Sequence, residues 1–127
     1  MAPILVVEDD ADSRELLCEL LRTYGYETVQ AANGLEALAW LDRTPALSLI
    51  VLDLMMPMMD GWEFRRRQQQ HPTHGRVPVL VASADTRVNA RPADLQAEAL
   101  LCKPLDFTRL LGLVRRFCGA PALGSGT

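Results

Sequence analysis

Six polar residues stand directly after apolar runs of this chain, where they could act together on a phosphoryl group or a cation. The runs cover residues 4–7, 47–52 and 77–82, with a further apolar segment before residue 103. If these runs are parallel strands of one sheet, the residues that follow them share one edge. Crowded carboxylates repel each other unless a cation or a proton intervenes. The residues are Glu8, Asp9, Asp10, Asp53, Ser83 and Lys103.

The candidate metal ligands among these residues are all oxygen atoms. Oxygen ligands favour Mg²⁺ or Mn²⁺ over zinc. A nucleotide or flavin site would place a Gly-rich or Ser/Thr-rich loop after the first strand, where this chain carries acids that would repel a phosphate. The sequence also contains no GxGxxG, GxxxxGK[ST] or GxSxG motif. These observations favour a metal-assisted phosphoryl site.

The elements that must position these residues alternate along the chain. The apolar runs are continuous, as expected of strands that are buried on both faces, and residues 26–31 form a weaker strand that we expect at an edge. Segments with helical spacing lie between them, including Leu16, Leu17, Leu20 and Leu21. A closing helix is predicted from residue 107 to residue 117, with Asp106 as its cap. This alternation predicts an α/β fold of parallel βαβ units with about five strands.

Composition restricts the function classes further. The chain has 127 residues, 49% of them hydrophobic, and its formal net charge is −3. This length suits one domain, and the negative charge argues against direct nucleic-acid binding. Three widely spaced cysteines and the lack of a basic leader or a long apolar segment favour a cytoplasmic protein that does not enter the membrane.

Four segments in this order resemble the receiver domain of bacterial response regulators. They are ILVVEDD, LIVLDLMMPMMDGWE, PVLVASA and LLCKP, within residues 3–118. The resemblance implies a flavodoxin-like (βα)5 three-layer sandwich with a parallel five-stranded sheet of order 2-1-3-4-5. It implies a receiver domain over residues 1–118, followed by a flexible tail over residues 119–127.

The same resemblance implies a role for each candidate residue. Asp53 would accept phosphate from a sensor histidine kinase or a phosphotransfer protein, and the chain would not turn over external substrates. Ser83 and Lys103 would bind the transferred group. The Mg²⁺ ligands would be Glu8, Asp9, Asp53 and the backbone carbonyl of Met55. A bulky Met55 side chain would also shield the acyl phosphate from water. Phosphorylation would then change the binding of an unknown downstream protein, with the chain as a monomer or a weak homodimer.

The chain departs from the family pattern in two places. Leu100 stands where many receivers carry an aromatic residue, and Pro92 predicts a short or displaced fourth helix that begins only there. These departures leave open a phosphorylation-independent adaptor that keeps the fold. A magnesium-dependent phosphatase is less favoured, because Met55 stands where its second aspartate would be.

Two further groups of residues have ordinary explanations. The run from Arg65 to Arg67 is expected to form a solvated helix face. His71 and His74 are expected to be surface histidines, since a metal site there lacks further ligands.

Overall fold

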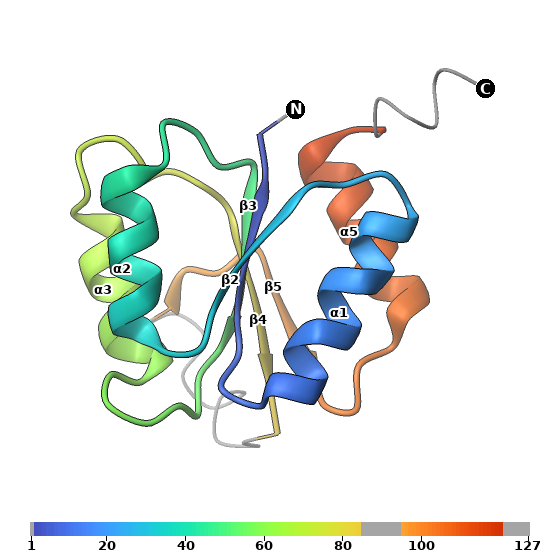
Figure 1. Cartoon of the computed structure of the whole chain (residues 1–127), viewed down its shortest axis with the longest axis horizontal. Helices are drawn as coiled ribbons and strands as arrows, with labels where there is room; N and C mark the ends of the chain where they lie inside the picture. The colour runs from blue at the N-terminus through green and yellow to red at the C-terminus, as the bar shows by residue number, and fades with distance from the viewer. Residues whose placement is uncertain (1, 85–94, 121–127) are drawn as a thin grey trace.

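The computed structural model describes residues 2–84 and 95–120, and these form one parallel sheet with helices on both faces (Figure 1). The chain alternates strands and helices, as the apolar pattern predicts. The elements are β1 (Ile4–Val7), α1 (Ala11–Thr23), β2 (Thr28–Ala31), α2 (Gly34–Arg43), β3 (Leu49–Asp53), α3 (Gly61–Gln69), β4 (Val79–Ser83), β5 (Ala99–Cys102) and α5 (Phe107–Cys118).

The five strands lie in the order β2-β1-β3-β4-β5 and every neighbouring pair is parallel. This confirms the flavodoxin-like fold and the edge position of the strand predicted near residues 26–31. Every residue of β1, β3 and β4 is buried, as continuous apolar runs require. The strands begin two residues later than the predicted runs at 47–52 and 77–82, and they end one residue later. Asp53 and Ser83 are therefore the last residues of β3 and β4 rather than the residues after them.

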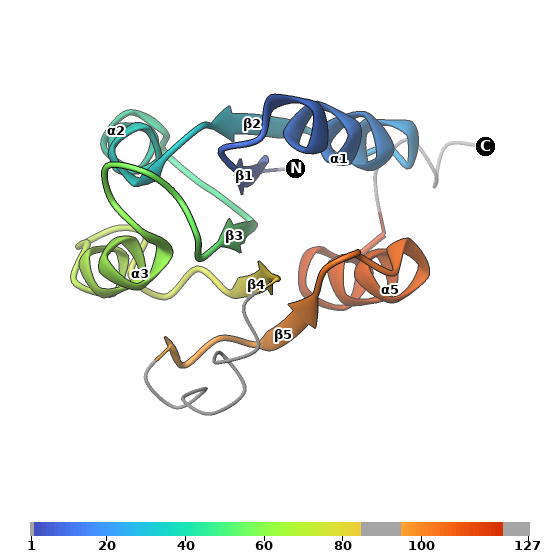
Figure 2. The ribbon, with the colours of Figure 1, turned by 90° about the horizontal axis from the view of Figure 1, so that it is seen from below.

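The helices form two layers around the sheet. Figure 2 shows α2 and α3 on one face of the sheet and α1 and α5 on the other. A separate apolar core fills each interface. Phe64 and Leu41 belong to the first core, while Leu21 and Leu110 belong to the second.

An Asp or Asn side chain begins each helix. Asp10, Asn33, Asp60 and Asp106 each accept a hydrogen bond from the backbone N–H three residues further on. Such N-caps satisfy one of the free amides of the first turn and stabilise a helix by about 1 kcal/mol each. The predicted cap at Asp106 is therefore confirmed, and the cap of α1 places the two acids before it at the end of β1.

Two predictions fall largely outside the residues that the structure describes. Pro92, where the fourth helix was expected to begin, lies within residues 85–94, outside the described residues. The tail expected over residues 119–127 is described only as far as residue 120. None of the described helices is long and apolar enough to cross a membrane.

Candidate functional site

The carboxyl ends of β1, β3, β4 and β5 meet at one edge of the sheet. Strand register aligns Val7 with Leu52, Asp53 with Ala82, and Ser83 with Cys102. Glu8 and Asp9 follow β1 directly, and Lys103 follows β5. Register alone therefore brings together side chains that are up to 95 residues apart in sequence.

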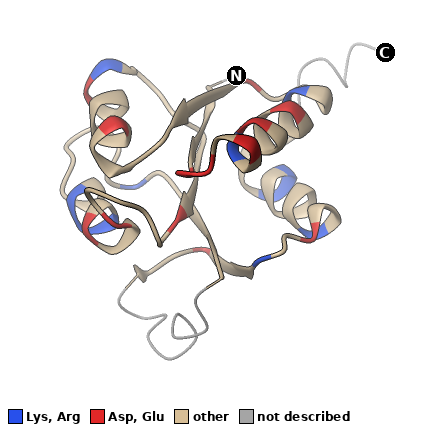
Figure 3. Cartoon of the chain, turned by 60° about the horizontal axis from the view of Figure 1, so that its bottom comes forward, with Lys and Arg blue, Asp and Glu red and all other residues tan. Residues whose placement is uncertain are grey.

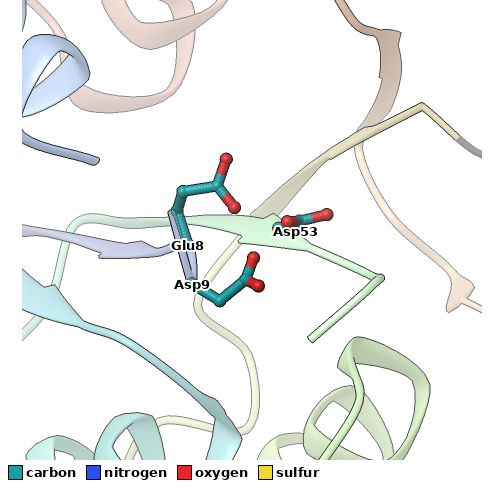
Figure 4. Close-up of side chains that lie close together, drawn as sticks. All are labelled: Glu8, Asp9 and Asp53. Atoms are coloured by element: carbon teal, nitrogen blue, oxygen red, sulfur yellow. The ribbon is translucent and has the colours of Figure 1, made fainter. Parts of the chain in front are cut away.

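Three carboxylates form the centre of this edge. Figure 4 shows Glu8 and Asp9, which follow β1, beside Asp53 at the end of β3. One oxygen of each lies within 4.8 Å of the others. Glu8 and Asp53 are buried, with 6% and 5% of their surface exposed, while Asp9 is exposed to solvent. This arrangement leaves one open side through which a cation or a phosphoryl group can enter.

Lys103 supplies a positive charge to the carboxylate cluster. Its Nζ donates to Oε1 of Glu8 at 2.5 Å and to Oδ2 of Asp53 at 3.3 Å. Burial alone would lower the pKa of Lys103, but the hydrogen bond to Glu8 and the charge of Asp53 raise it above its usual value. The ammonium therefore stays charged, and a bound phosphoryl oxygen could replace either carboxylate as its partner.

The crowding of the carboxylates also affects the pKa of Glu8. Burial raises the pKa of Glu8 first, and the neighbouring Asp53 carboxylate raises it further. Lys103 offsets only part of this increase. Two buried carboxylates sharing one ammonium thus carry an excess of negative charge, which a second cation would relieve.

The loop after β3 fixes the other oxygen of Asp53. The backbone N–H of Met55 donates to Oδ1 of Asp53 at 3.2 Å. Further along, the N–H of Gly61 donates to the carbonyl of Leu54 at 2.9 Å. A Cβ at residue 61 would lie 2.6 Å from Cα of Leu54 and 2.7 Å from the carbonyl oxygen of Asp53. Only glycine lets α3 begin this close to the end of β3.

Arg14 supports the site from α1 and was not among the predicted residues. Its guanidinium donates to the carbonyl of Glu8 at 2.8 Å and to Oε1 of Gln30 at 3.1 Å. These bonds hold the end of β1 against β2. The sequence signal for this role is weak, because an arginine in the first turns of a helix is usually a surface charge.

The structure brings Glu8, Asp9, Asp53 and Lys103 together, with Ser83 buried on the adjacent strand end. The Met55 side chain points to solvent, with 52% of its surface exposed, while its amide contacts Asp53. Asp10 is not part of the cluster, because its carboxylate caps α1.

Two expectations about ordinary surface residues were wrong. Arg65 is buried rather than solvated, since its guanidinium donates to the carbonyls of Leu95 and Gln96, both at 2.7 Å. His74 is also buried, and its Nε2 lies 2.6 Å from the carbonyl of Thr44. Backbone carbonyls from distant segments supply partners that sequence spacing does not reveal.

The donor set fits a hard divalent cation. Within the described part of the chain, Oε2 of Glu8 is a buried oxygen with no hydrogen-bond partner, which a bound cation would satisfy. Carboxylate oxygens, one of them on an exposed side chain, suit Mg²⁺, which keeps several of its waters. Glu8, Asp9 and Asp53 thus form an acidic magnesium site.

Known proteins share this fold and this arrangement. A family model described as "Response regulator receiver domain" matches residues 4–115. The chain is 32% identical over 114 residues to sporulation initiation phosphotransferase F of Bacillus subtilis, covering 90% of this chain and 91% of that protein.

Solved structures agree with the family match. Chemotaxis protein CheY4 of Vibrio cholerae is 29% identical with a TM-score of 0.83, over 92% of this chain and 98% of that one. Response regulator TrrA of Thermotoga maritima, solved in complex with Mg(2+)-BeF, is 29% identical with a TM-score of 0.82, over 92% and 99% of the two chains. The chain therefore belongs to the response regulator receiver domains, phosphoacceptor switches of two-component signalling that use an acidic magnesium site and are not turnover enzymes.

Proposed function

We propose that Asp53 is the residue that accepts the phosphoryl group, and that the donor is the phosphohistidine of a sensor histidine kinase or a phosphotransfer protein. The observation that carries the proposal is the position of Asp53. It is buried at the end of β3, bonded to Lys103 through one oxygen, and within 4.8 Å of two further acids. Glu8 shares the burial, the bond to Lys103 and the neighbouring acids, but Asp53 differs from it in ending β3 and in accepting the N–H of Met55 through its other oxygen.

The transfer exchanges one bond to phosphorus for another. A carboxylate oxygen of Asp53 forms the new P–O bond while the P–N bond of phosphohistidine breaks, and the departing imidazole nitrogen takes up a proton. Lys103 faces the oxygen that reacts and can pair with the incoming phosphoryl group. Glu8, Asp9, Asp53 and the carbonyl of Met55 would hold Mg²⁺, which would supply charge stabilisation to the transferred phosphoryl group.

Ser83 and Lys103 are proposed to hold the transferred group. Ser83 ends β4 beside Asp53, and its carbonyl accepts the N–H of Lys103 at 3.1 Å, which joins the backbones of the two residues. The hydroxyl of Ser83 can donate to a phosphoryl oxygen, while the ammonium pairs with another. Contacts of this kind bias a two-state domain toward the conformation that a downstream protein binds.

An apolar cavity beside the site suits the approach of a donor protein. It has a volume of about 200 Å³, and its lining includes Glu8, Asp53 and Lys103 of the site together with Leu16 and Phe107 of the two helices. A donor imidazole can therefore reach Asp53 from the side of α1 and α5. A receiver unit over residues 1–118 and a cytoplasmic location belong to the same proposal, which the family match over residues 4–115 supports.

The test is phosphorylation by acetyl phosphate in the presence of Mg²⁺, followed by intact mass. The wild type should gain one phosphate and Asp53→Asn should gain none. Asp60→Asn is the matched control, because it changes another aspartate of the same loop and an asparagine still caps α3. Equal labelling of Asp53→Asn would assign the phosphate elsewhere. No labelling of the wild type would favour the adaptor, which keeps the fold and binds partners without phosphate.

A further inference from the structure

Arg14 reaches from α1 to the backbone of the first acid of the site. Its Nη1 donates to the carbonyl of Glu8 at 2.8 Å, and its Nε donates to Oε1 of Gln30 at 3.1 Å. Figure 3 shows the acidic segment after β1 in red, with a basic segment in blue within the first turns of α1. One guanidinium thus joins the residue after β1 to the edge strand β2, beside the magnesium site.

The start of α1 explains how this side chain reaches backward. Asp10 caps the helix, and the N–H of Arg14 donates to the carbonyl of Asp10 at 2.9 Å, which closes the first turn. Side chains of a helix lean toward its N-terminus, so a long side chain at residue 14 extends toward residue 8. The helix dipole disfavours a positive charge near this end. The stability of α1 alone therefore does not account for an arginine here.

The carbonyl that Arg14 binds belongs to the peptide group between two magnesium ligands. This group joins Glu8 to Asp9 and is planar, so the direction of its carbonyl also fixes the direction of the bond to Cα of Asp9. The N–H of Glu8 is held as well, since it donates to the carbonyl of Ala31 at 3.0 Å. Figure 4 shows both carboxylates turned toward the side of Asp53. The backbone bonds of Glu8 therefore restrict the directions in which both carboxylates leave the chain.

Gln30 holds the guanidinium in place from the edge strand. It is part of β2, and its own carbonyl accepts the indole N–H of Trp40 at 2.7 Å. Arg14 and Gln30 are both partly buried, so water competes less for their contact than it would at an open surface. With one donor on Gln30 and another on Glu8, the planar guanidinium has a defined orientation.

We propose that Arg14 and Gln30 are positioning residues for Mg²⁺, which hold the peptide group between Glu8 and Asp9 so that both carboxylates are oriented before the ion binds. Because the ligands are ordered when the chain folds, Mg²⁺ binding does not carry the entropy cost of ordering them. Removal of groups that orient metal ligands typically weakens metal binding about 10–100-fold. This role concerns the ion alone and is independent of phosphate transfer.

The charge of Arg14 and its hydrogen bonds have opposite effects on the affinity for Mg²⁺. A guanidinium near an acidic site repels the ion, so loss of the charge alone would tighten Mg²⁺ binding. Loss of the hydrogen bonds frees the peptide group between the two ligands and would weaken Mg²⁺ binding. The sign of the measured change therefore separates a positioning residue from a nearby charge.

The test is calorimetric titration of the folded domain with Mg²⁺, with the free energy of unfolding measured separately in the presence of a chelator. Arg14→Met removes the charge and both hydrogen bonds, and its Kd for Mg²⁺ should rise about tenfold. Arg14→Lys keeps the charge, but one ammonium does not reproduce the two directed bonds of the guanidinium, so its Kd should rise as well. Gln30→Met leaves the charge in place and removes only the contact on β2, so it should also weaken Mg²⁺ binding.

Arg22→Met is the matched control. Arg22 is the other arginine of α1 and also donates to β2, at 3.5 Å to Oγ1 of Thr28, but it lies in the last turn of the helix. Its replacement should leave the Kd for Mg²⁺ at the wild-type value. If Arg14→Met lowered the free energy of unfolding but left the Kd of the folded protein unchanged, Arg14 would be a structural residue only and the proposal would be overturned. Tighter Mg²⁺ binding by Arg14→Met, wild-type binding by Gln30→Met or equal weakening by Arg22→Met would overturn it too.

Discussion

Lys103 and Glu8 form an ion pair across the carboxyl edge of the sheet, with 2.5 Å between Nζ and Oε1. This approach is closer than the 3.3 Å from the same ammonium to Asp53. Lys103 is also the only lysine in the chain. One ammonium thus neutralises part of a cluster that holds three carboxylates.

Replacement of this lysine should separate metal binding from phosphorylation. Lys103→Ala removes a positive charge beside the acidic site, so its affinity for Mg²⁺ should rise about tenfold or more. Uptake of phosphate from acetyl phosphate should nevertheless become slower, because the group that pairs with the phosphoryl oxygen is gone. Calorimetric titration and the rate of mass gain measure the two effects. Lys103→Arg retains the charge and should keep the wild-type Mg²⁺ affinity, while weaker Mg²⁺ binding by Lys103→Ala would contradict this electrostatic picture.

Removal of Mg²⁺ should lower the stability of the domain. The ion binds folded carboxylates that lie within 4.8 Å of one another, and the unfolded chain offers no such site. At a free concentration one hundred times its Kd, it should add about 2.7 kcal/mol to the free energy of unfolding, and a chelator should abolish this gain. The measurement is the melting temperature with and without Mg²⁺. Asp9→Asn and Asp53→Asn should lose most of the increase, whereas Glu15→Gln, an exposed acid of α1, should retain it.

Arg65 should be a structural residue of α3. Replacement by methionine keeps much of the side-chain volume but leaves the carbonyls of Leu95 and Gln96 without their donor. We expect a loss of about 2–4 kcal/mol in the free energy of unfolding, measured by denaturant titration. Arg66→Met is the control, because the side chain of Arg66 is 70% exposed and pairs only with Glu63 among the described residues, so it should cost about 1 kcal/mol at most. Equal losses of unfolding free energy for the two variants would show that the buried contacts of Arg65 do not stabilise the fold.

The three cysteines should react with a thiol reagent in a defined order. Cys102 is exposed, Cys118 is partly buried and Cys18 is buried. Burial raises the pKa of both Cys18 and Cys118, so fewer of these thiols are ionised at neutral pH and their alkylation should become faster as pH increases. Peptide mass spectrometry after iodoacetamide should find the label on Cys102 first. Cys102→Ser should remove the fast phase, and a fast phase that persists in this variant would contradict the burial of the other two.

Met55 should control the lifetime of the phosphorylated form. Its side chain is half exposed next to the residue proposed to carry phosphate, where it can shield the acyl phosphate from water. Met55→Ala should therefore accelerate the loss of phosphate about tenfold, followed as the decay of the phosphorylated mass. Met58→Ala is the control, since Met58 is 78% exposed in the same loop and should leave the rate unchanged. Equal decay of Met55→Ala and the wild type would reject shielding.

The sequence predicts the sheet and most of the site because both depend on local patterns. Continuous apolar runs mark β1, β3 and β4, and the residues after them reach one edge through strand register alone. The buried arginine and histidine were missed for the opposite reason. Arg65 and His74 are satisfied by carbonyls of Leu95, Gln96 and Thr44, which lie about thirty residues away and have no side-chain signature.

The helical pattern gives a further example of what sequence spacing does not reveal. Leu16 has the spacing of a core residue, yet it is exposed while Leu17 and Leu21 are buried. The periodicity of apolar residues shows which residues share a face of a helix. The angle at which the helix packs decides which edge of that face meets the sheet. The same uncertainty explains why the exposure of Leu16 could not be predicted from its spacing.

The tight approach at Gly61 restricts how this domain can be redesigned. Residues 56–58 can be exchanged in a library aimed at new partners, since they are exposed or partly exposed, whereas Met55 bonds to Asp53, Met59 belongs to the core and Asp60 caps α3. Residue 61 has to stay invariant in every member, because any side chain there would collide with the backbone of Asp53 and Leu54. A loop segment grafted from another protein should therefore leave Gly61 in place.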